Sequence, residues 1–168
     1  MEISVRELSV GNKSLMSFTH ELPISSWTMN EREFSFLSNP LIEGNLRRRD
    51  GRIYGEFVVK ISLKEDCSRC LMPASSDYIC EIRGYLMQEE EETDDLDDDI
   101  ILVEDFALRL EHILDLALLE DLPAKVICSE DCRGLCPDCG ANLNQTQCSC
   151  EASAPRIDSR LERLRELM

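Results

Sequence analysis

The amino-acid sequence predicts an α+β fold: an antiparallel, β-rich domain with one core helix, then a C-terminal four-cysteine module and a terminal helix. Three observations predict this fold. Apolar and polar residues alternate through much of the first half of the chain, and one stretch after residue 103 has the apolar spacing of a helix. Six of the nine cysteines lie between Cys128 and Cys150. The 168 residues are enough for one domain with a small additional module.

Strands are expected throughout the N-terminal half of the chain. Six segments have the alternation or composition of extended chain, at residues 1–10, 15–22, 32–39, 41–48, 53–64 and 75–87. Pro23 ends the second segment, and Asp50-Gly51 predicts a hairpin turn between the fourth and the fifth. Trp27 is the only tryptophan, and we expect it to anchor the core or an edge of the sheet.

The predicted hairpin turn carries the densest positive patch of the chain. Four arginines form it: Arg47, Arg48, Arg49 and Arg52. They could contact phosphate groups, but a single small patch displaces few counterions from a nucleic acid. A solvated hairpin tip is therefore the preferred interpretation.

The second half of the chain begins with an acidic run and continues into a helix. Residues 89–99 carry nine acidic side chains, and a solvated loop is expected there. A short strand is expected at 100–103. The core helix follows the two acids at 104–105 and ends at Pro123, because acids favour a helix N-terminus and proline stops a helix. Its apolar face comprises Phe106, Leu110, Ile113, Leu114, Ala117 and Leu118.

The spacing of the C-terminal cysteines predicts a metal site. C-P-D-C-G, which begins at Cys136, has the form of a zinc knuckle: two thiolates three residues apart, then a glycine that permits positive φ. Cys148 and Cys150 complete four soft ligands for one tetrahedral centre. A disulfide cluster would need an oxidising compartment. The odd number of cysteines and an N-terminus without a signal-peptide pattern favour reduced thiols, bound zinc and a cytoplasmic location.

Eight of the cysteines can form two sites of four. The preferred grouping places Cys67, Cys70, Cys128 and Cys132 in a first site and Cys136, Cys139, Cys148 and Cys150 in a second. The C-x2-C at 67–70 follows a strand and is only half of a tetrahedral site, so it needs a second pair from elsewhere. In the alternative grouping, Cys128, Cys132, Cys136 and Cys139 form one site, and the strand-end pair joins Cys148 and Cys150. Cys80 is left over and is expected to be buried.

The predicted strands, helices and cysteine groups divide the chain into three parts. Residues 1–127 would be the β-rich domain with the acidic loop 89–99, residues 128–152 a zinc-binding module, and residues 153–168 a C-terminal helix. Arg69 and Arg133 lie beside cysteines. They could support the thiolates by charge or hydrogen bonds, or simply face the solvent, and the sequence leaves both interpretations open.

The chain resembles the YceD family, the large ribosomal RNA subunit accumulation proteins. The resemblance rests on C-S-R-C-L after a strand, the acidic insert, a helix ending in L-P, and C-x3-C-R-G-L-C-P-x-C-G-x-N-L-N followed by C-x-C. It covers most of the chain from about Leu41 onward. It implies a role in accumulation of large-subunit (23S) rRNA and hence in ribosome biogenesis, in the cytosol or in plant organelles.

The formal charge of −16 bears on possible partners. Phosphate contacts need lysine and arginine, so net repulsion would oppose binding to a nucleic acid, whereas a basic protein is attracted. We expect the partner to be a precursor of the large ribosomal subunit. The contact would be made with rRNA or, preferably, with a basic ribosomal protein. No apolar run is long enough to span a membrane, and no small-molecule substrate is expected.

We expect a binding protein without enzymatic activity, and the alternatives are an enzyme, such as a zinc hydrolase or a thiol oxidoreductase, and a sensor. A catalytic zinc keeps an open coordination position, but two complete sets of four cysteines leave none, and the only histidines are His20 and His112. A zinc or thiol redox sensor, in which metal release unfolds the module, is the other alternative.

Overall fold

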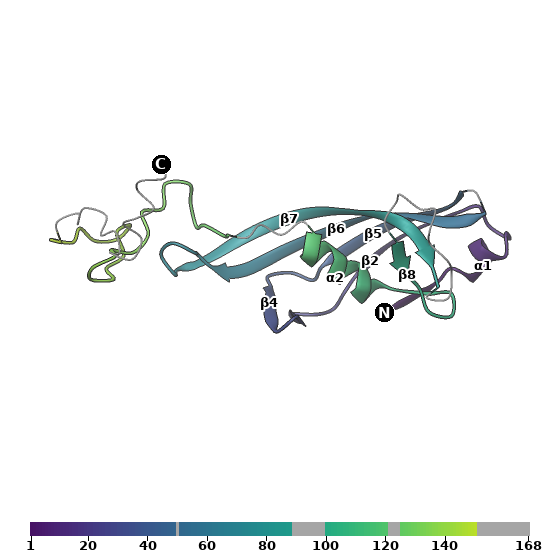
Figure 1. Ribbon diagram of the computed structural model, residues 1–168, viewed down its shortest axis with the longest axis horizontal. Helices are drawn as coiled ribbons and strands as arrows, with labels where there is room; N and C mark the ends of the chain where they lie inside the picture. Colours follow the sequence, from purple (N-terminus) through teal and green to yellow (C-terminus); the bar gives the residue numbers. More distant parts are fainter. Residues whose placement is uncertain (50, 89–99, 121–124, 151–168) are drawn as a thin grey trace, which may run out of the picture.

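The computed structural model describes residues 1–49, 51–88, 100–120 and 125–150 (Figure 1). The acidic run 89–99, Pro123 and the predicted terminal helix within 153–168 lie outside these residues. The molecule is elongated, with helix α2 (Leu110–Glu120) on one face of a curved sheet and the cysteine-rich segment beyond one end of that sheet (Figure 1). No helix in the described ranges is long and apolar enough to cross a membrane.

Nine strands and two helices make up the regular structure of the described residues. The strands are β1 (Glu2–Ser4), β2 (Leu15–Glu21), β3 (Ser26–Met29), β4 (Arg32–Phe36), β5 (Leu41–Arg49), β6 (Arg52–Asp66), β7 (Pro73–Met87), β8 (Ile100–Leu102) and β9 (Ala107–Arg109), and the second helix is α1 (Arg6–Ser9). In the main sheet β6 pairs with β5, β4 and β7, while β2 extends the β5 edge and β3 pairs with β4. β1 and β9 form a separate two-stranded sheet.

The longest element is the antiparallel hairpin formed by β6 and β7. Each strand has 15 residues, and their register runs without interruption from Ile53 opposite Leu86 to Asp66 opposite Pro73. Phe57, Val59, Ile61 and Leu63 alternate into the core. This alternation is the period of two that a half-buried strand requires. The hairpin therefore reaches past the core and carries its connecting turn, residues 67–72, to one end of the molecule (Figure 1).

Helix α2 covers the core face of the sheet. Its buried side chains are Leu110, Ile113, Leu114, Ala117 and Leu118, five of the six residues on the predicted apolar face. They pack with the inward side chains of β5, β6 and β7 into one continuous core. Burial of this apolar face is the main stabilising contribution of the helix, because short helices are weak on their own.

The predicted fold class is confirmed in its coarse form, since the described chain is mainly antiparallel sheet with few helices. Two predictions within it are wrong. The core helix begins at Leu110, because the segment before it pairs as β9 with β1, and Val5 N–H donates to the Phe106 carbonyl at 2.8 Å. Residues 1–10 contain only a short strand, followed by α1. The periodicity of a sequence describes local segments, so it does not reveal a pairing between two strands that are distant in the chain.

One further strand pair departs from the antiparallel pattern. β8 lies parallel to β7, with Tyr85 opposite Ile100 and Met87 opposite Leu102. The strand itself was predicted, within residues 100–103, but its direction was not. Three consecutive apolar residues do not indicate which neighbouring strand they pair with, or in which direction.

Two leucines on α2 provide a matched test of this packing. Leu114 is 0% exposed and Leu119 is 58% exposed. We expect Leu114→Ala to lower the free energy of unfolding by about 2–5 kcal/mol, because it removes buried methyl groups and leaves a cavity. Leu119→Ala should change it by less than about 0.5 kcal/mol. Urea unfolding of both variants measures the difference, and equal losses would contradict the placement of the helix.

Candidate metal centres

The first group of sulfurs joins the end of the hairpin to the segment that follows α2. Cys67 and Cys70 lie in the β6–β7 turn, and Cys128 and Cys132 lie in the described chain beyond residue 125. All four Sγ atoms lie within 4.8 Å of one another. Cys67 Sγ is 3.8 Å from Cys132 Sγ, and Cys70 Sγ is 3.6 Å from Cys128 Sγ. Three of the four side chains are buried, so the group lies inside the contact between the two segments.

The turn that presents Cys67 and Cys70 is tight. The Cys67 N–H donates to the Met72 carbonyl, and the Leu71 N–H donates to the Cys67 carbonyl, each at 2.9 Å. Leu71 has a φ of +57°, a left-handed conformation that is unusual for leucine. This bend brings both sulfurs to the same side of the turn, where Arg69 N–H lies 3.5 Å from Cys67 Sγ.

Backbone contacts hold the partner segment against this turn. Ser68 N–H donates to the Val126 carbonyl at 2.8 Å, and Leu135 N–H donates to the Arg69 carbonyl at 3.1 Å. The Arg69 guanidinium donates to the Cys132 carbonyl at 3.0 Å. Arg69 therefore supports the first group by hydrogen bonds from both its backbone and its side chain, which answers one of the two questions that the sequence left open.

The second group of sulfurs comes from a single short stretch of chain. Cys136, Cys139, Cys148 and Cys150 have their Sγ atoms within 4.8 Å of one another. Gly140 N–H donates to the Cys136 carbonyl at 2.9 Å, and Gly140 has a φ of +73°. This is the geometry expected for the knuckle, because a residue with a Cβ would be strained at that φ.

Asn144 connects the two groups and was not singled out from the sequence. Its side-chain N–H donates to Cys132 Sγ at 3.4 Å, and its Oδ1 accepts from Arg133 N–H at 2.8 Å. Arg133 thus contributes its backbone to this network. The amide-rich composition of residues 142–147 was the available signal, but composition does not indicate which amide contacts a sulfur. A hydrogen bond of this kind orients a metal ligand and stabilises its thiolate.

The distances within the first group fit a four-thiolate metal centre. A tetrahedral zinc site with bonds of about 2.3 Å to sulfur has sulfurs roughly 3.8 Å apart, whereas a disulfide bond is about 2.0 Å long. The described cysteines form no disulfide. Four thiolates in this arrangement suit zinc or iron. Both groups follow the preferred grouping and not the alternative, but metal binding by these eight residues stays a prediction.

The titration of the first group shows how strongly its members interact. Burial alone would raise the pKa of Cys67, but backbone N–H groups, that of Arg69 first, lower it to about 6. Cys132, followed by Cys70, raises the pKa of Cys128 to about 12. Two neighbouring thiolates repel one another, so ionisation of one thiol keeps the next protonated. A bound cation would remove this conflict.

The second group has the same pattern. Backbone N–H groups, that of Cys139 first, lower the pKa of Cys136 to about 7. Cys139, followed by Cys136, raises the pKa of Cys150 to about 12. Both groups therefore contain one thiol that ionises near neutral pH and another that stays protonated without a cation.

Cys80 and the arginine-rich hairpin end lie apart from both groups. Cys80 is buried within β7 opposite Val59, as predicted. Arg47 and Arg49 lie over the ring of Tyr54 at 5.4 and 5.5 Å from its centroid, and Arg47 pairs with Glu56 at 3.4 Å. Tyr54 and Tyr85 are both buried, and their ring centroids lie 5.1 Å apart.

The fold and these two groups define a class of protein: a β-sheet protein whose longest hairpin ends at a pair of candidate four-thiolate metal centres. The chain belongs to the family described as Large ribosomal RNA subunit accumulation protein YceD, whose model matches residues 55–168. The match begins within β6, later than the resemblance at Leu41 suggested, and includes all eight grouped cysteines.

Two individual relatives are similar to this chain at low sequence identity. The chain is 29% identical over 146 residues to the maize (Zea mays) protein "Large ribosomal RNA subunit accumulation protein YCED homolog 1, chloroplastic", with 66% of this chain and 48% of the relative covered. It is 34% identical over 112 residues to an uncharacterized protein of Mycobacterium tuberculosis, with 61% and 49% covered. The chain thus spans about half the length of these curated relatives. No solved structure matches it.

The pKa pattern predicts proton release when metal binds. Four cysteines have a raised pKa and are protonated at pH 8, namely Cys70, Cys128, Cys148 and Cys150. Since metal binds thiolates, loading both centres at pH 8 should release at least about four protons per chain. The number should rise as the pH falls to 6, because Cys136, with a pKa of about 7, then also starts protonated. Metal affinity should fall over the same range.

Isothermal titration of the metal-free protein in buffers of different ionisation enthalpy measures this release. Cys80→Ala is the control and should not change the number of protons. A release of fewer than about two protons, or one that does not depend on pH, would contradict the proposed ligand set.

Proposed function

We propose that this protein supports accumulation of large-subunit (23S) rRNA during ribosome assembly, as a non-enzymatic binding protein whose shape depends on two structural zinc ions. The observation that carries the proposal is the family match over residues 55–168, which includes the long hairpin and both cysteine groups. The name of the maize relative describes that protein as a large ribosomal RNA subunit accumulation protein, which agrees with the rRNA part of the proposal.

The proposed zinc ligands are the eight grouped cysteines. Bound zinc would supply a crosslink and the positive charge that four close thiolates need. The first centre would fasten the segment after α2 to the hairpin end, and the second would close the knuckle. With four sulfurs on each metal no coordination position is left for a substrate, which supports a binding role over catalysis.

The proposed domain division follows from these centres. Residues 1–127 would form the β-rich domain, 128–152 the zinc module and 153–168 a terminal helix. Because the first centre takes two ligands from each side of the boundary at 128, the module would be fixed to the domain by metal and not by a flexible linker.

The proposed partner is the precursor of the large ribosomal subunit, contacted through a basic ribosomal protein or through rRNA. A formal charge of −16 favours the basic protein, since opposite charges accelerate and select encounters. The proposed compartment is the cytoplasm, where thiols stay reduced and available to zinc.

Complementation of cells that lack the endogenous protein tests the role and the metal together. The wild-type chain should restore the ratio of large- to small-subunit rRNA and carry two zinc ions. Cys70→Ala should lose the first centre, retain one zinc and restore the ratio poorly, because the module detaches from the hairpin. Cys80→Ala is the matched control and should behave like the wild type.

Two results would refute parts of this proposal. If the cells keep a normal rRNA ratio without the protein, the role in rRNA accumulation is wrong. If purified wild-type protein contains no zinc, or Cys70→Ala retains two ions, the assignment of the first centre is wrong, whatever the rRNA ratio.

A further inference from the structure

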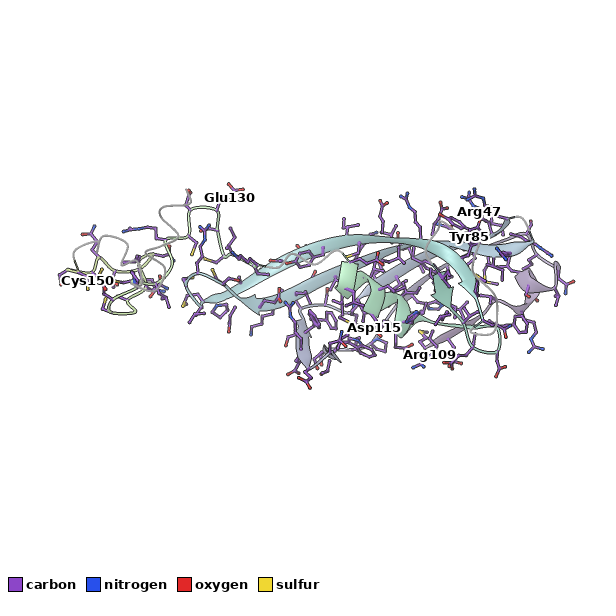
Figure 2. The ribbon with its side chains drawn as sticks, in the orientation of Figure 1. Arg47, Tyr85, Arg109, Asp115, Glu130 and Cys150 are labelled. Atoms are coloured by element: carbon purple, nitrogen blue, oxygen red, sulfur yellow. The ribbon has the colours of Figure 1, made fainter. Side chains whose placement is uncertain are left out.

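A cavity of about 220 Å³ lies beside α2, on the same side of the sheet as that helix. It is enclosed by β3, the segment from β8 to β9, and the first two turns of α2. The side chains that determine its chemistry are Trp27, Glu104, Arg109, Glu111, His112 and Asp115, and Arg109 and Asp115 are labelled in Figure 2. The volume corresponds to roughly seven water molecules at about 30 Å³ each, which is enough for the end of one long side chain.

The cavity is more negative than its cations can balance. Three carboxylates line it, those of Glu104, Glu111 and Asp115, together with the cation Arg109. The Met1 amino group pairs with Glu111 Oε1. Three negative charges therefore face two positive ones. A cleft with low-dielectric walls and a net negative charge attracts a cation more strongly than an open surface does.

Glu111 has an unused acceptor in this environment. Its Oε2 is buried and has no hydrogen-bond donor within the described part of the chain. Burial alone would raise its pKa, but the Met1 amino group, the backbone N–H of Glu111 and the charge of Arg109 together hold the pKa below its ordinary value. The side chain is therefore ionised, and a buried acceptor without a donor carries a free-energy cost. A ligand that donates hydrogen bonds would relieve this cost.

Trp27 forms one wall and is fixed in place. Its indole N–H donates to Asp115 Oδ1 at 2.6 Å, which joins β3 to α2 across 88 positions of sequence. The hydrogen bond occupies the only donor of the indole, so the rest of the ring offers π-surface and apolar contact. Leu102, Val103 and Ala107 add apolar wall beside the carboxylates. The cavity thus combines an apolar lining with acceptors.

We propose that this cavity binds the guanidinium group of an arginine side chain presented by a partner protein. The proposal rests on the proposed function, in which the partner is a basic ribosomal protein, and it identifies the group that this partner inserts. A guanidinium is planar, stacks on aromatic rings, is weakly hydrated and donates up to five hydrogen bonds. Its alkyl stem suits the apolar wall, and its charge balances the excess carboxylate.

Trp27 fluorescence measures binding at this cavity directly, because it is the only tryptophan in the chain. The zinc-loaded full chain is titrated with a short peptide that contains one arginine, and with matched peptides that contain citrulline or lysine. The arginine peptide should give a saturable change in emission. Citrulline has the shape without the charge and should give none, and lysine should bind more weakly because it lacks the planar donors.

Two isosteric variants and one control locate the site. Glu104→Gln and Asp115→Asn each remove one charge, and the asparagine still offers an oxygen to the Trp27 indole. Each should weaken arginine binding by roughly threefold to tenfold, the range typical of a lost charged hydrogen bond in a partly exposed site. Glu43→Gln makes the same charge change on the outer face of β5 and should leave binding unchanged. Urea unfolding verifies that all three variants are folded.

Three results would overturn the proposal: no saturable response to arginine, an equal response to citrulline, or full binding by both cavity variants. The rRNA complementation is independent of the titration. If the wild-type chain restores rRNA but binds no arginine peptide, only the cavity proposal fails. If the chain binds the peptide as expected but cells without it keep normal rRNA, only the proposed function fails.

Discussion

The close approach of four sulfurs at the hairpin end is the constraint on which the rest of the cysteine-rich segment depends. Within residues 125–150 the only β-pairing is the isolated bridge between Leu135 and Asn142, and the buried cluster at this end is small, formed chiefly by Cys67, Cys70, Ala74, Val126 and Cys132. So little apolar burial does not offset the entropy of ordering such a segment. Four thiols within 4.8 Å also resist ionisation together, as the opposed pKa values of Cys67 and Cys128 indicate. A bound cation would resolve both difficulties, because it would neutralise the sulfurs and crosslink the two segments.

The two ends of the molecule therefore depend on different kinds of interaction. At one end, α2 and the sheet bury a continuous apolar core, and their packing does not need metal. At the other end, the β6–β7 hairpin serves as a rigid arm, because 14 consecutive paired positions hold its turn away from the core. The arm places the cysteine-rich segment beyond the end of the sheet, apart from α2 (Figure 1). The hairpin therefore separates the cysteine-rich segment from the apolar core by the length of its paired strands.

The sequence was most informative where a local pattern determines the structure. Alternation identified β2, β5, β6 and β7 to within one or two residues, because one face of each strand is buried. The grouping of the cysteines followed from spacing and from the need of a strand-end pair for two further ligands. Features that depend on distant contacts were missed. β9 replaces the first turn of the predicted helix only because β1 pairs with it, and the parallel direction of β8 is set by β7. Trp27 was expected to be an anchor, but its partner Asp115, like the contact of Asn144 with Cys132 Sγ, is visible only in three dimensions.

Heteronuclear NMR of the protein loaded with cadmium-113 identifies the cysteines on each metal ion, because scalar coupling links the ion to the β-protons of the cysteines that bind it. Two cadmium resonances are expected. One should couple to Cys67, Cys70, Cys128 and Cys132, and the other to Cys136, Cys139, Cys148 and Cys150. A single resonance, or one that links Cys128 and Cys132 to Cys136 and Cys139, would contradict this grouping, because the hairpin would then not be fastened to the segment after α2 by a shared metal.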